Sequence, residues 1–282
     1  MRARAAWVLN LDAEDELRLG AAYAPRAAAS ERARELSAAL TTLTGEDAVV
    51  VERGAPPPRE ARGLPGHAWC PTPSALAALA AAGAIVGPTP PVHVLRAVNH
   101  RRFHHAQGAP LAGARWLEDA DEILSTVARG RWLLKRAFGF AGRGRLACGD
   151  GVDAGAFVAR ALREDGGVAV EPRVEVTLDV SLHGVIEPGG AWSLGRPVAS
   201  QVRSGAWQRA LDAEPALSLD ERAALFAEGE RVAVALHAAG YFGPFAVDGF
   251  RHEDGFCARC EINARFGMAF GVGWGRYPRA GR

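Results

Sequence analysis

The chain has 282 residues, of which 49% are hydrophobic and 23% charged, and its net charge at pH 7 is +1. These values are typical of a folded soluble protein with one large or two ordinary domains, and they exclude any general attraction to nucleic acid or to an anionic membrane. The apolar run at residues 5–11 is too short for a secretory signal and ends at Asp12, and no run reaches membrane length. We therefore expect a cytoplasmic protein, with neither nucleic acid nor a membrane as its partner.

The first 90 residues alternate short apolar runs with Ala- and Leu-rich segments. They predict strands at 5–11, 48–52, 67–70 and 84–86, and helices at 30–43 and 74–82. This alternation is typical of a small open α/β layer. A proline-rich linker at 87–91 follows, so we expect two domains, 1–91 and 92–282.

Residues 92–107 predict a helix that carries His100 and His104 one turn apart. Two such histidines can share a metal ion, but no third ligand is evident nearby, and an ordinary polar helix face is the favoured interpretation. Beyond this helix the pattern predicts helices at 154–163 and 219–239, strands at 168–175 and 177–185, and a hairpin at 245–263.

Lys135 is the only lysine among 33 basic residues, and it stands between a predicted strand and a loop with Gly139, Gly142 and Gly144. A lysine is a compact point charge, whereas an arginine is a wide planar fork. Beside glycine backbone, a buried phosphate oxygen leaves room for an ammonium group, so Lys135 predicts a phosphate contact. The alternative is a leftover surface charge. The loop is not a Walker A loop, because no Gly-Lys-Ser/Thr follows at the needed spacing.

Glu171-Pro172-Arg173-Val174 interrupts a strand with proline. Proline removes a ladder donor and confines the strand to an edge or a crossover. Free backbone groups there would suit an adenine ring, although a plain edge strand is the alternative.

The segment 243–265 predicts a hairpin with a two-residue turn at Asp254-Gly255. That turn places Asp248 directly opposite Glu261, and alternation puts Asn263 and Arg265 on the same face as Glu261. Opposed carboxylates repel unless cations lie between them. Oxygen ligands with an added amide suit Mg²⁺ or Mn²⁺. The alternative is a solvated hairpin in which Arg265 or Arg259 neutralises the acids.

The remaining motifs carry less information. Cys257 and Cys260 form a C-x-x-C, but residues three apart on a strand point to opposite faces, so we interpret them as packing residues. Arg203 and Trp207 lie in a predicted polar loop, where a substrate-site role and a plain surface role are equally compatible with the pattern.

In this order, the lysine at a strand end, the glycine-rich loop, the Glu-Pro strand and the pattern Asp248-x12-Glu261-x-Asn263-x-Arg265 resemble the ATP-grasp superfamily. Its members include D-alanine–D-alanine ligase, biotin carboxylase and glutathione synthetase. The resemblance covers the chain from about Val92 onward. It implies an α/β (α+β) ATP-grasp fold with a lid at about 114–172, preceded by a small α/β pre-ATP-grasp domain.

The resemblance also implies roles for individual residues. Lys135 would hold the ATP phosphates, and the loop from Gly139 to Gly144 would close over them. Glu171, Arg173 and Val174 would form the adenine hinge, and Asp179 or Glu175 would bind the ribose. Asp248, Glu261 and Asn263 would hold two Mg²⁺ ions, and Arg265 would meet the transferring phosphoryl group. Arg101 or Arg102 stands where the family often has a second lysine.

The activity implied by this resemblance is that of an ATP-dependent ligase. A small-molecule carboxylate would be activated as an acyl phosphate and attacked by an amine or a thiol. A kinase of the same fold that phosphorylates a hydroxyl and a nucleotide-binding regulatory protein without turnover are the alternatives. The substrates stay open, and so does the oligomeric state, with a homodimer as one option.

Overall fold

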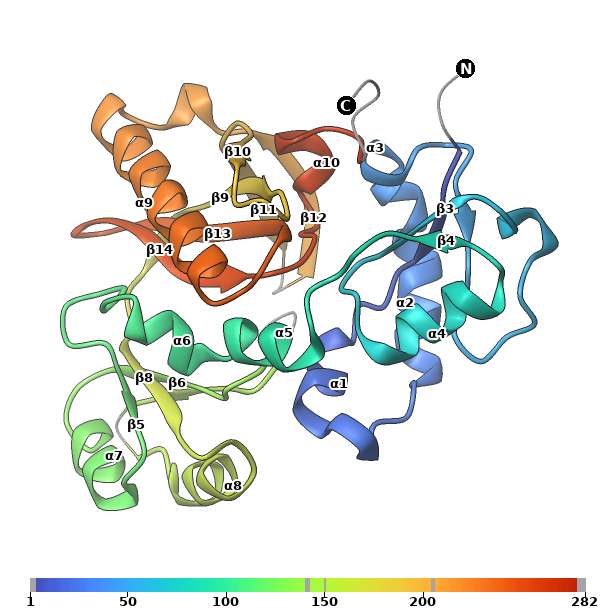
Figure 1. The fold of residues 1–282 in the computed structure, drawn as a ribbon. Coiled ribbons are helices and arrows are strands. Elements are labelled where there is room, and N and C mark those ends of the chain that lie inside the picture. The colour runs from blue at the N-terminus through green and yellow to red at the C-terminus, as the bar shows by residue number, and fades with distance from the viewer. Residues whose placement is uncertain (1–3, 140–142, 150, 204–205, 278–282) are drawn as a thin grey trace.

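The computed structural model of the chain describes residues 4–139, 143–149, 151–203 and 206–277 (Figure 1). These residues form two four-stranded sheets and one six-stranded sheet. None of the helices in these ranges has the length and hydrophobicity that spanning a bilayer requires.

The N-terminal sheet is parallel, with the strand order β2-β1-β3-β4. Its strands are β1 (Ala6–Val8), β2 (Val49–Val50), β3 (Pro65–Ala68) and β4 (Ile85–Val86). The accompanying helices are α1 (Ala13–Leu19), α2 (Ala27–Ser37), α3 (Thr41–Thr44) and α4 (Pro73–Ala81), with short 3-10 helices η1 (Gly20–Ala22), η2 (Ala38–Leu40) and η3 (Arg59–Ala61). The predicted α/β alternation is confirmed. Helix α1 has no counterpart among the predicted elements, although three acidic residues in its first turn suit a helix N-terminus.

The helix predicted over 92–107 is broken in two. Helix α5 (Val92–Asn99) ends before His100, which has an extended backbone, and α6 (Arg101–Ala106) begins after it. The Nδ1 of His100 accepts a hydrogen bond from the backbone N–H of Arg102 at 3.0 Å and caps α6. The break turns Arg101 inward, where it is buried.

The second sheet is antiparallel, with the order β5-β8-β6-β7. Its strands are β5 (Arg115–Leu117), β6 (Trp132–Lys135), β7 (Arg145–Cys148) and β8 (Val168–Pro172), and its helices are α7 (Ala120–Val127) and α8 (Gly155–Asp165). A separate apolar cluster that includes Ile123, Leu134 and Val158 joins both helices to the sheet. This unit therefore has its own core and presents the end of β6, with Lys135, at its border.

The third sheet is also antiparallel, with the order β12-β11-β9-β13-β14, and β10 pairs with β9. Its strands are β9 (Val176–Ile186), β10 (Trp192–Leu194), β11 (Val198–Arg203), β12 (Ala206–Asp212), β13 (Gly243–His252) and β14 (Gly255–Asn263), and its helices are η4 (Glu214–Ala216), α9 (Leu219–Ala238) and α10 (Phe270–Gly273). A capping box between Ser218 and Glu221 starts α9, and Arg251 of β13 donates to Glu221 at 2.7 Å. The long helix is thereby fixed to the hairpin.

One apolar core cluster joins the N-terminal sheet to the third sheet. Trp7 of β1, Leu95 of α5, Phe245 of β13 and Phe266 are all members and are nearly fully buried. Continuous burial of this kind holds elements in fixed relative positions, because interiors are close-packed. The segment after β14 is therefore positioned by the N-terminal sheet as well as by its own hairpin.

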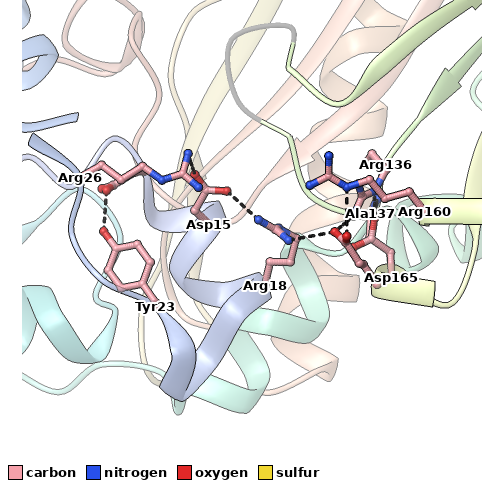
Figure 2. Close-up of polar contacts among 10 residues, drawn as sticks. Asp15, Arg18, Tyr23, Arg26, Arg136, Ala137, Arg160 and Asp165 are labelled. Atoms are coloured by element: carbon pink, nitrogen blue, oxygen red, sulfur yellow. Dashed lines mark hydrogen bonds and ion pairs between the residues drawn. The ribbon is translucent and has the colours of Figure 1, made fainter. Parts of the chain in front are cut away.

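A polar bridge links α1 to the second sheet (Figure 2). Arg18 of α1 lies 3.4 Å from Glu164 of α8, and Glu164 also accepts from Arg136 at 2.9 Å. Arg136 donates a second bond to Asp165, the last residue of α8. Because Arg136 directly follows Lys135, these contacts fix the end of β6 to α8.

Candidate functional site

A cavity of about 670 Å³ is lined by both antiparallel sheets, by α2 and by residues 267–269 after β14. Its volume is typical of small-molecule sites. The predicted site residues that line it are Lys135, Gly139, Glu171, Arg173, Val174, Asp179, Asp248, Glu261, Asn263 and Arg265. Gly144 does not line it, and Gly142 lies outside the described residues. The fold thus brings nearly all of the predicted residues to one place.

Lys135 is the last residue of β6 and is only 4% exposed, so it is not a leftover surface charge. Its Nζ lies 2.6 Å from Oε2 of Glu171, and Nε2 of His105 lies 3.6 Å from the other carboxylate oxygen. Burial alone would raise the pKa of Glu171, but Lys135 and His105 outweigh burial and lower this pKa to about 2. A buried ion pair therefore holds the ammonium group at the cavity wall.

The glycines around the predicted loop serve different purposes. A β-carbon on Gly139 would lie 2.6 Å from the carbonyl oxygen of Arg143, so no side chain fits there. Gly144 has φ +72° and accepts a hydrogen bond from the backbone N–H of Arg136 at 2.8 Å. That conformation favours glycine. Gly144 thus closes the turn between β6 and β7, and only Gly139 of the two lies on the cavity wall.

Strand β8 is not an edge strand, in contrast to the prediction from Pro172. Strand β5 pairs with β8 only over Val168–Val170, whereas β6 pairs with it through Glu171 and Pro172. Within the described residues, one backbone edge of β8 is therefore without a strand neighbour from Glu171 onward, where Arg173 and Val174 also line the cavity. The unpaired backbone edge that the sequence predicts for adenine binding is therefore limited to the end of β8.

Asp248 lies directly opposite Glu261, as predicted, but the hairpin that brings them together differs from the prediction. The turn is Glu253-Asp254, since His252 pairs with Gly255. The register then changes between Asp248 and Phe250. The predicted turn at Asp254-Gly255 is wrong, and the change of register restores the predicted pairing at the acids.

Gly249 is the residue at which this change occurs. A β-carbon there would lie 2.6 Å from the carbonyl oxygen of Cys257 and 3.0 Å from that of Ala258, so the two strands approach too closely for a side chain. Such a close approach marks a β-bulge. The bulge also explains why Cys260, predicted to face the core, lines the cavity.

Two arginines meet Glu261. Arg101 donates to Oε1 at 2.6 Å, and Nη2 of Arg145 lies 3.6 Å from Oε2. Burial alone would raise the pKa of Glu261, but Arg101, Arg145 and Lys135 outweigh burial and lower it to about 2. Arg102 instead pairs with Glu118 at the surface. Of the two arginines considered from the sequence, Arg101 is therefore the one at the site.

The two arginines named in the alternative form ion pairs with other acids, although the charge of Arg265 still acts to lower the pKa of Asp248. Arg259 pairs with Glu228 and donates to backbone carbonyls. Arg265 donates to Glu14 of α1 through Nε at 2.5 Å and to the carbonyl oxygen of Phe266 at 2.9 Å. Glu14 lies 251 positions earlier in the chain, and sequence reasoning missed it because nothing local in either segment points to the other.

Asp248 is held by hydrogen bonds from two neutral side chains. Ser181 donates to Oδ1 at 2.5 Å, and the Asn263 amide donates to Oδ2 at 2.8 Å. Burial and the charge of Glu261 raise the pKa of Asp248 to about 6. A half-buried carboxyl whose ionised form is disfavoured fits a position that a cation would occupy.

The donor set also fits a hard metal ion. Asp248 and Glu261 supply carboxylate oxygens, and Asn263 would supply its amide oxygen if the amide were rotated. In the described part of the chain, no group of three or more His, Cys, Asp or Glu side chains could hold a metal. Mg²⁺ commonly takes one or two carboxylates and completes its shell with phosphate oxygens and water, so this set is compatible with Mg²⁺ beside a bound phosphate.

Alternate residues of β9 form a row along the cavity. Asp179, Ser181 and His183 all line it, as the period of a strand requires. Glu175 does not line the cavity, and its backbone N–H donates to Glu253 at 2.6 Å. Of the two acids considered for a ribose, only Asp179 lies on the cavity wall.

The other candidate motifs form no site among the described residues. Cys257 donates through Sγ to the carbonyl oxygen of Pro110 at 3.2 Å and packs internally. His104 is buried, and burial lowers its pKa to about 3. Arg203 and Trp207 lie in strands β11 and β12 rather than in a loop, and their side chains are outside the described part of the chain.

Neither a family model nor a curated protein matches this sequence. Solved structures do match its fold. D-alanyl-alanine synthetase A from Vibrio cholerae has 14% identity and a TM-score of 0.57, and the match covers 95% of this chain and 90% of that one. Biotin carboxylase from Campylobacter jejuni, in a complex with β-γ-ATP, has 16% identity and a TM-score of 0.57, with 95% and 66% covered.

The biotin carboxylase domain of Hydrogenobacter thermophilus 2-oxoglutarate carboxylase, with MgADP, ADP and bicarbonate, has 17% identity and a TM-score of 0.51. This match covers 67% of our chain and 44% of that one, so the chain spans less than half the length of that relative. All three are ATP-grasp enzymes. Together with the sheet arrangement, these matches show that the chain adopts the ATP-grasp fold.

Proposed function

We propose that the chain is an ATP- and Mg²⁺-dependent ligase that activates a carboxylate as an acyl phosphate for attack by an amine or a thiol. One observation carries the proposal. The only lysine of the chain and the set Asp248, Glu261, Asn263 and Arg265 come from two separate sheets and line a single cavity in an ATP-grasp fold. Fold alone does not fix chemistry, so the proposal depends on this juxtaposition.

Each residue takes a role in the proposed reaction. The open edge at Glu171–Val174 would bind the adenine, Asp179 the ribose, and Lys135 the phosphates. Asp248, Glu261 and Asn263 would hold Mg²⁺, which when bound neutralises phosphate charge and orients the phosphoryl group. Lys135 pairs with Glu171, and Arg101 and Arg145 pair with Glu261. In the proposed complex these positive charges would face the phosphates.

The chemistry proceeds in two balanced steps. An oxygen of the substrate carboxylate attacks the γ-phosphorus, the bond from phosphorus to the bridging oxygen breaks, and ADP leaves. The nucleophile then attacks the acyl carbon, inorganic phosphate leaves, and the nucleophile loses a proton. This reaction needs positioning and charge neutralisation more than covalent help from the protein. Arg265 would stabilise the charge that develops during transfer.

The test uses hydroxylamine as a general amine nucleophile. Purified protein with Mg-ATP is offered a panel of organic acids, and both ADP and hydroxamate are measured. A ligase releases the two products together and only when an acid is present. Asp248→Asn should abolish both, whereas Asp254→Asn, the same substitution in the exposed turn of the same hairpin, should not.

Other outcomes would identify the alternatives. ADP formation with hydroxyl compounds and no hydroxamate would indicate a kinase. Tight ATP binding without turnover on any acid, amine, thiol or alcohol would indicate a regulatory nucleotide-binding protein, and the ligase proposal would be wrong.

A further inference from the structure

The cavity has two chemically different ends. The carboxylates that line the cavity are all at one end, which runs from the Glu171–Val174 segment to the Asp248–Glu261 pair. They belong to Glu171, Asp179, Asp248 and Glu261. Strand β9 continues from Asp179 past Ser181 to His183, and residues 267–269 and α2 line the cavity beyond that point. Among the described residues, no acidic side chain lines this second end, which we call the acid-free end.

The acid-free end is largely apolar. Leu36 of α2 and Met268 pack against the same core cluster as Trp69 and Phe266. Trp69 lies beneath the guanidinium of Arg265, whose Cζ is 6.0 Å from the ring centroid. Among the described residues, the charged side chains that line this end are Arg32, which is exposed on α2 and pairs with Glu35 at 2.8 Å, and Arg265, which pairs with Glu14; neither of these two acids lines the cavity. Apolar walls with cations and without acids favour an anionic ligand with an apolar body.

His183 contributes a directed polar group to this end. It is 1% exposed, packs edge-on against Phe270 and lies between two glycines, since a β-carbon on Gly267 would be 3.0 Å from Nε2 and one on Gly273 would be 3.0 Å from Nδ1. Nδ1 is buried and has no hydrogen-bond partner among the residues that the structure describes. An orphaned buried N–H is rarer than an under-satisfied acceptor, which favours the tautomer with the proton on Nε2.

This tautomer makes His183 a neutral donor on the cavity wall. Burial lowers the pKa of His183 to about 3, so the ring carries no charge near neutral pH. A neutral N–H donor suits a carboxylate or carbonyl oxygen. An ammonium group has only donors, and it would meet Arg32, Arg265 and the Nε2–H of His183 without any acidic side chain to receive it.

We infer that the acid-free end binds the substrate acid, and that this acid has an apolar body and carries no ammonium group beside its carboxylate. His183 donates through Nε2 to an acid oxygen, and Leu36 and Met268 contact the body. The inference rests on the proposed function for the identity of the reacting group. It adds that free α-amino acids are excluded as the activated substrate.

Four probes test the inference by isothermal titration calorimetry, with and without Mg-ADP. These are acetate, 3-phenylpropanoate, L-phenylalanine and D-phenylalanine, of which the last three differ only in the ammonium group and its configuration. We expect 3-phenylpropanoate to bind at least tenfold more tightly than acetate and than either amino acid. Equal or tighter binding of an amino acid, or no binding of 3-phenylpropanoate while Mg-ADP binds, would overturn the inference.

A matched pair of variants tests the location. Arg32→Glu and Arg34→Glu make the same change on exposed positions of α2, but only Arg32 lines the cavity. Arg32→Glu should weaken the binding of 3-phenylpropanoate at least fivefold, whereas Arg34→Glu should weaken it less than twofold. Neither variant should change the affinity for Mg-ADP. His183→Leu, which keeps the buried volume, should also weaken the acid about fivefold. Equal effects of the two α2 variants would contradict the placement.

Failure of the ligase proposal is distinguishable from failure of this inference. If 3-phenylpropanoate binds as expected but neither ADP nor hydroxamate forms, the ligase reaction is wrong and the acid site stands. If hydroxamate forms with amino acids and not with unsubstituted acids, the ligase stands and the acid-free end does not select as inferred.

Discussion

The guanidinium of Arg265, which follows β14, donates to the carboxylate of Glu14 on α1 across 251 positions of sequence. Both side chains are buried, and Oε2 of Glu14 has no hydrogen-bond partner within the described part of the chain. Burial outweighs the attraction of Arg265 and raises the pKa of Glu14. The residue predicted to meet the phosphoryl group is therefore positioned from the N-terminal sheet.

Glu14→Ala should destabilise the protein strongly, because it leaves the guanidinium of Arg265 buried without its carboxylate. Breaking a buried pair costs about 3–5 kcal/mol. Asp15→Ala on the same helix is the control, since Asp15 lies in partly exposed pairs with Arg18 and Arg26, and such pairs contribute about 0–1 kcal/mol. Urea denaturation of both variants measures the difference, and similar losses would argue against a structural role for Glu14.

Lys135 should be protected from amine acylation by Mg-ATP. As the only lysine, it gives a single labelled side chain beside the N-terminus, and bound phosphates would cover its ammonium group. Arg129→Lys adds an exposed lysine just before β6 as an internal control, and its labelling should not respond to nucleotide. Peptide mass spectrometry reports both sites, and equal labelling of Lys135 at saturating Mg-ATP would exclude the phosphate contact.

Lys135→Arg should weaken nucleotide binding about tenfold although it keeps the charge, which corresponds to about 1.4 kcal/mol. The planar fork needs more room than the ammonium group beside Glu171. Calorimetry with Mg-ADP measures the affinity. Parent-like affinity in this variant would show that charge alone is sufficient.

Asp248 should make stability fall as the pH rises. Its pKa is about 6 in the folded chain against an ordinary value of 3.8. The folded state thus holds the proton more tightly, and the contribution of this group is complete below pH 3.8 and is lost as the pH rises through 6. Asp248→Asn should gain stability over the parent across this window, by up to about 3 kcal/mol, since one pKa unit corresponds to about 1.4 kcal/mol.

The difference between variant and parent is the quantity to measure, because other groups titrate nearby. Burial lowers the pKa of both His104 and His183 to about 3, so their contributions are lost as the pH falls from 6.5. Those terms cancel in the difference. Asp254→Asn should show no such trend, and Mg-ADP should raise the melting temperature of the parent more than that of Asp248→Asn. If the stability difference between Asp248→Asn and the parent stayed constant between pH 4 and 7, the raised pKa of Asp248 would be contradicted.

Arg265→Lys should reduce turnover far more than nucleotide affinity. The substitution keeps a cation beside Glu14, so the fold is retained, but it removes the planar donors that would meet the transferring phosphoryl group. Loss of one such donor typically lowers the rate by about 10²–10³. Single-turnover rates and Mg-ATP affinity are measured on the same preparation, and an equal loss in both would indicate a ground-state binding role.

The predictable part of this protein is the part set by local patterns. The strand position of Lys135 and the α/β alternation of the first 90 residues follow from the hydrophobic period, whereas the predicted pairing of Asp248 with Glu261 is met only because the change of register at Gly249 offsets the misplaced turn. Gly249 inside a strand is a sequence signal for the bulge, and the predicted hairpin, which keeps one register throughout, does not include it. The turn was misplaced because Asp254-Gly255 matches the residue preference of a two-residue hairpin turn.

The remaining features depend on packing between distant segments. The contacts of Arg101 with Glu261 and of Glu14 with Arg265 arise because α6 and α1 dock on the third sheet. The central position of β8 results from its pairing with β5 on one side and β6 on the other, and Pro172 alone does not specify these neighbours. No short-range pattern encodes these choices, because each of these residues is compatible with several partners of opposite charge or matching shape.

The bulge at Gly249 separates the geometry of the hairpin tip from that of the acid pair. Because the register is reset there, the strand ends and the turn at Glu253-Asp254 can change length without sliding Asp248 past Glu261. The tip is thus a permissive position for inserting a fluorophore-binding tag or a short epitope, whereas adding or removing one residue in the bulge itself, at Gly249 or between Cys257 and Glu261, would change which residue lies opposite Asp248.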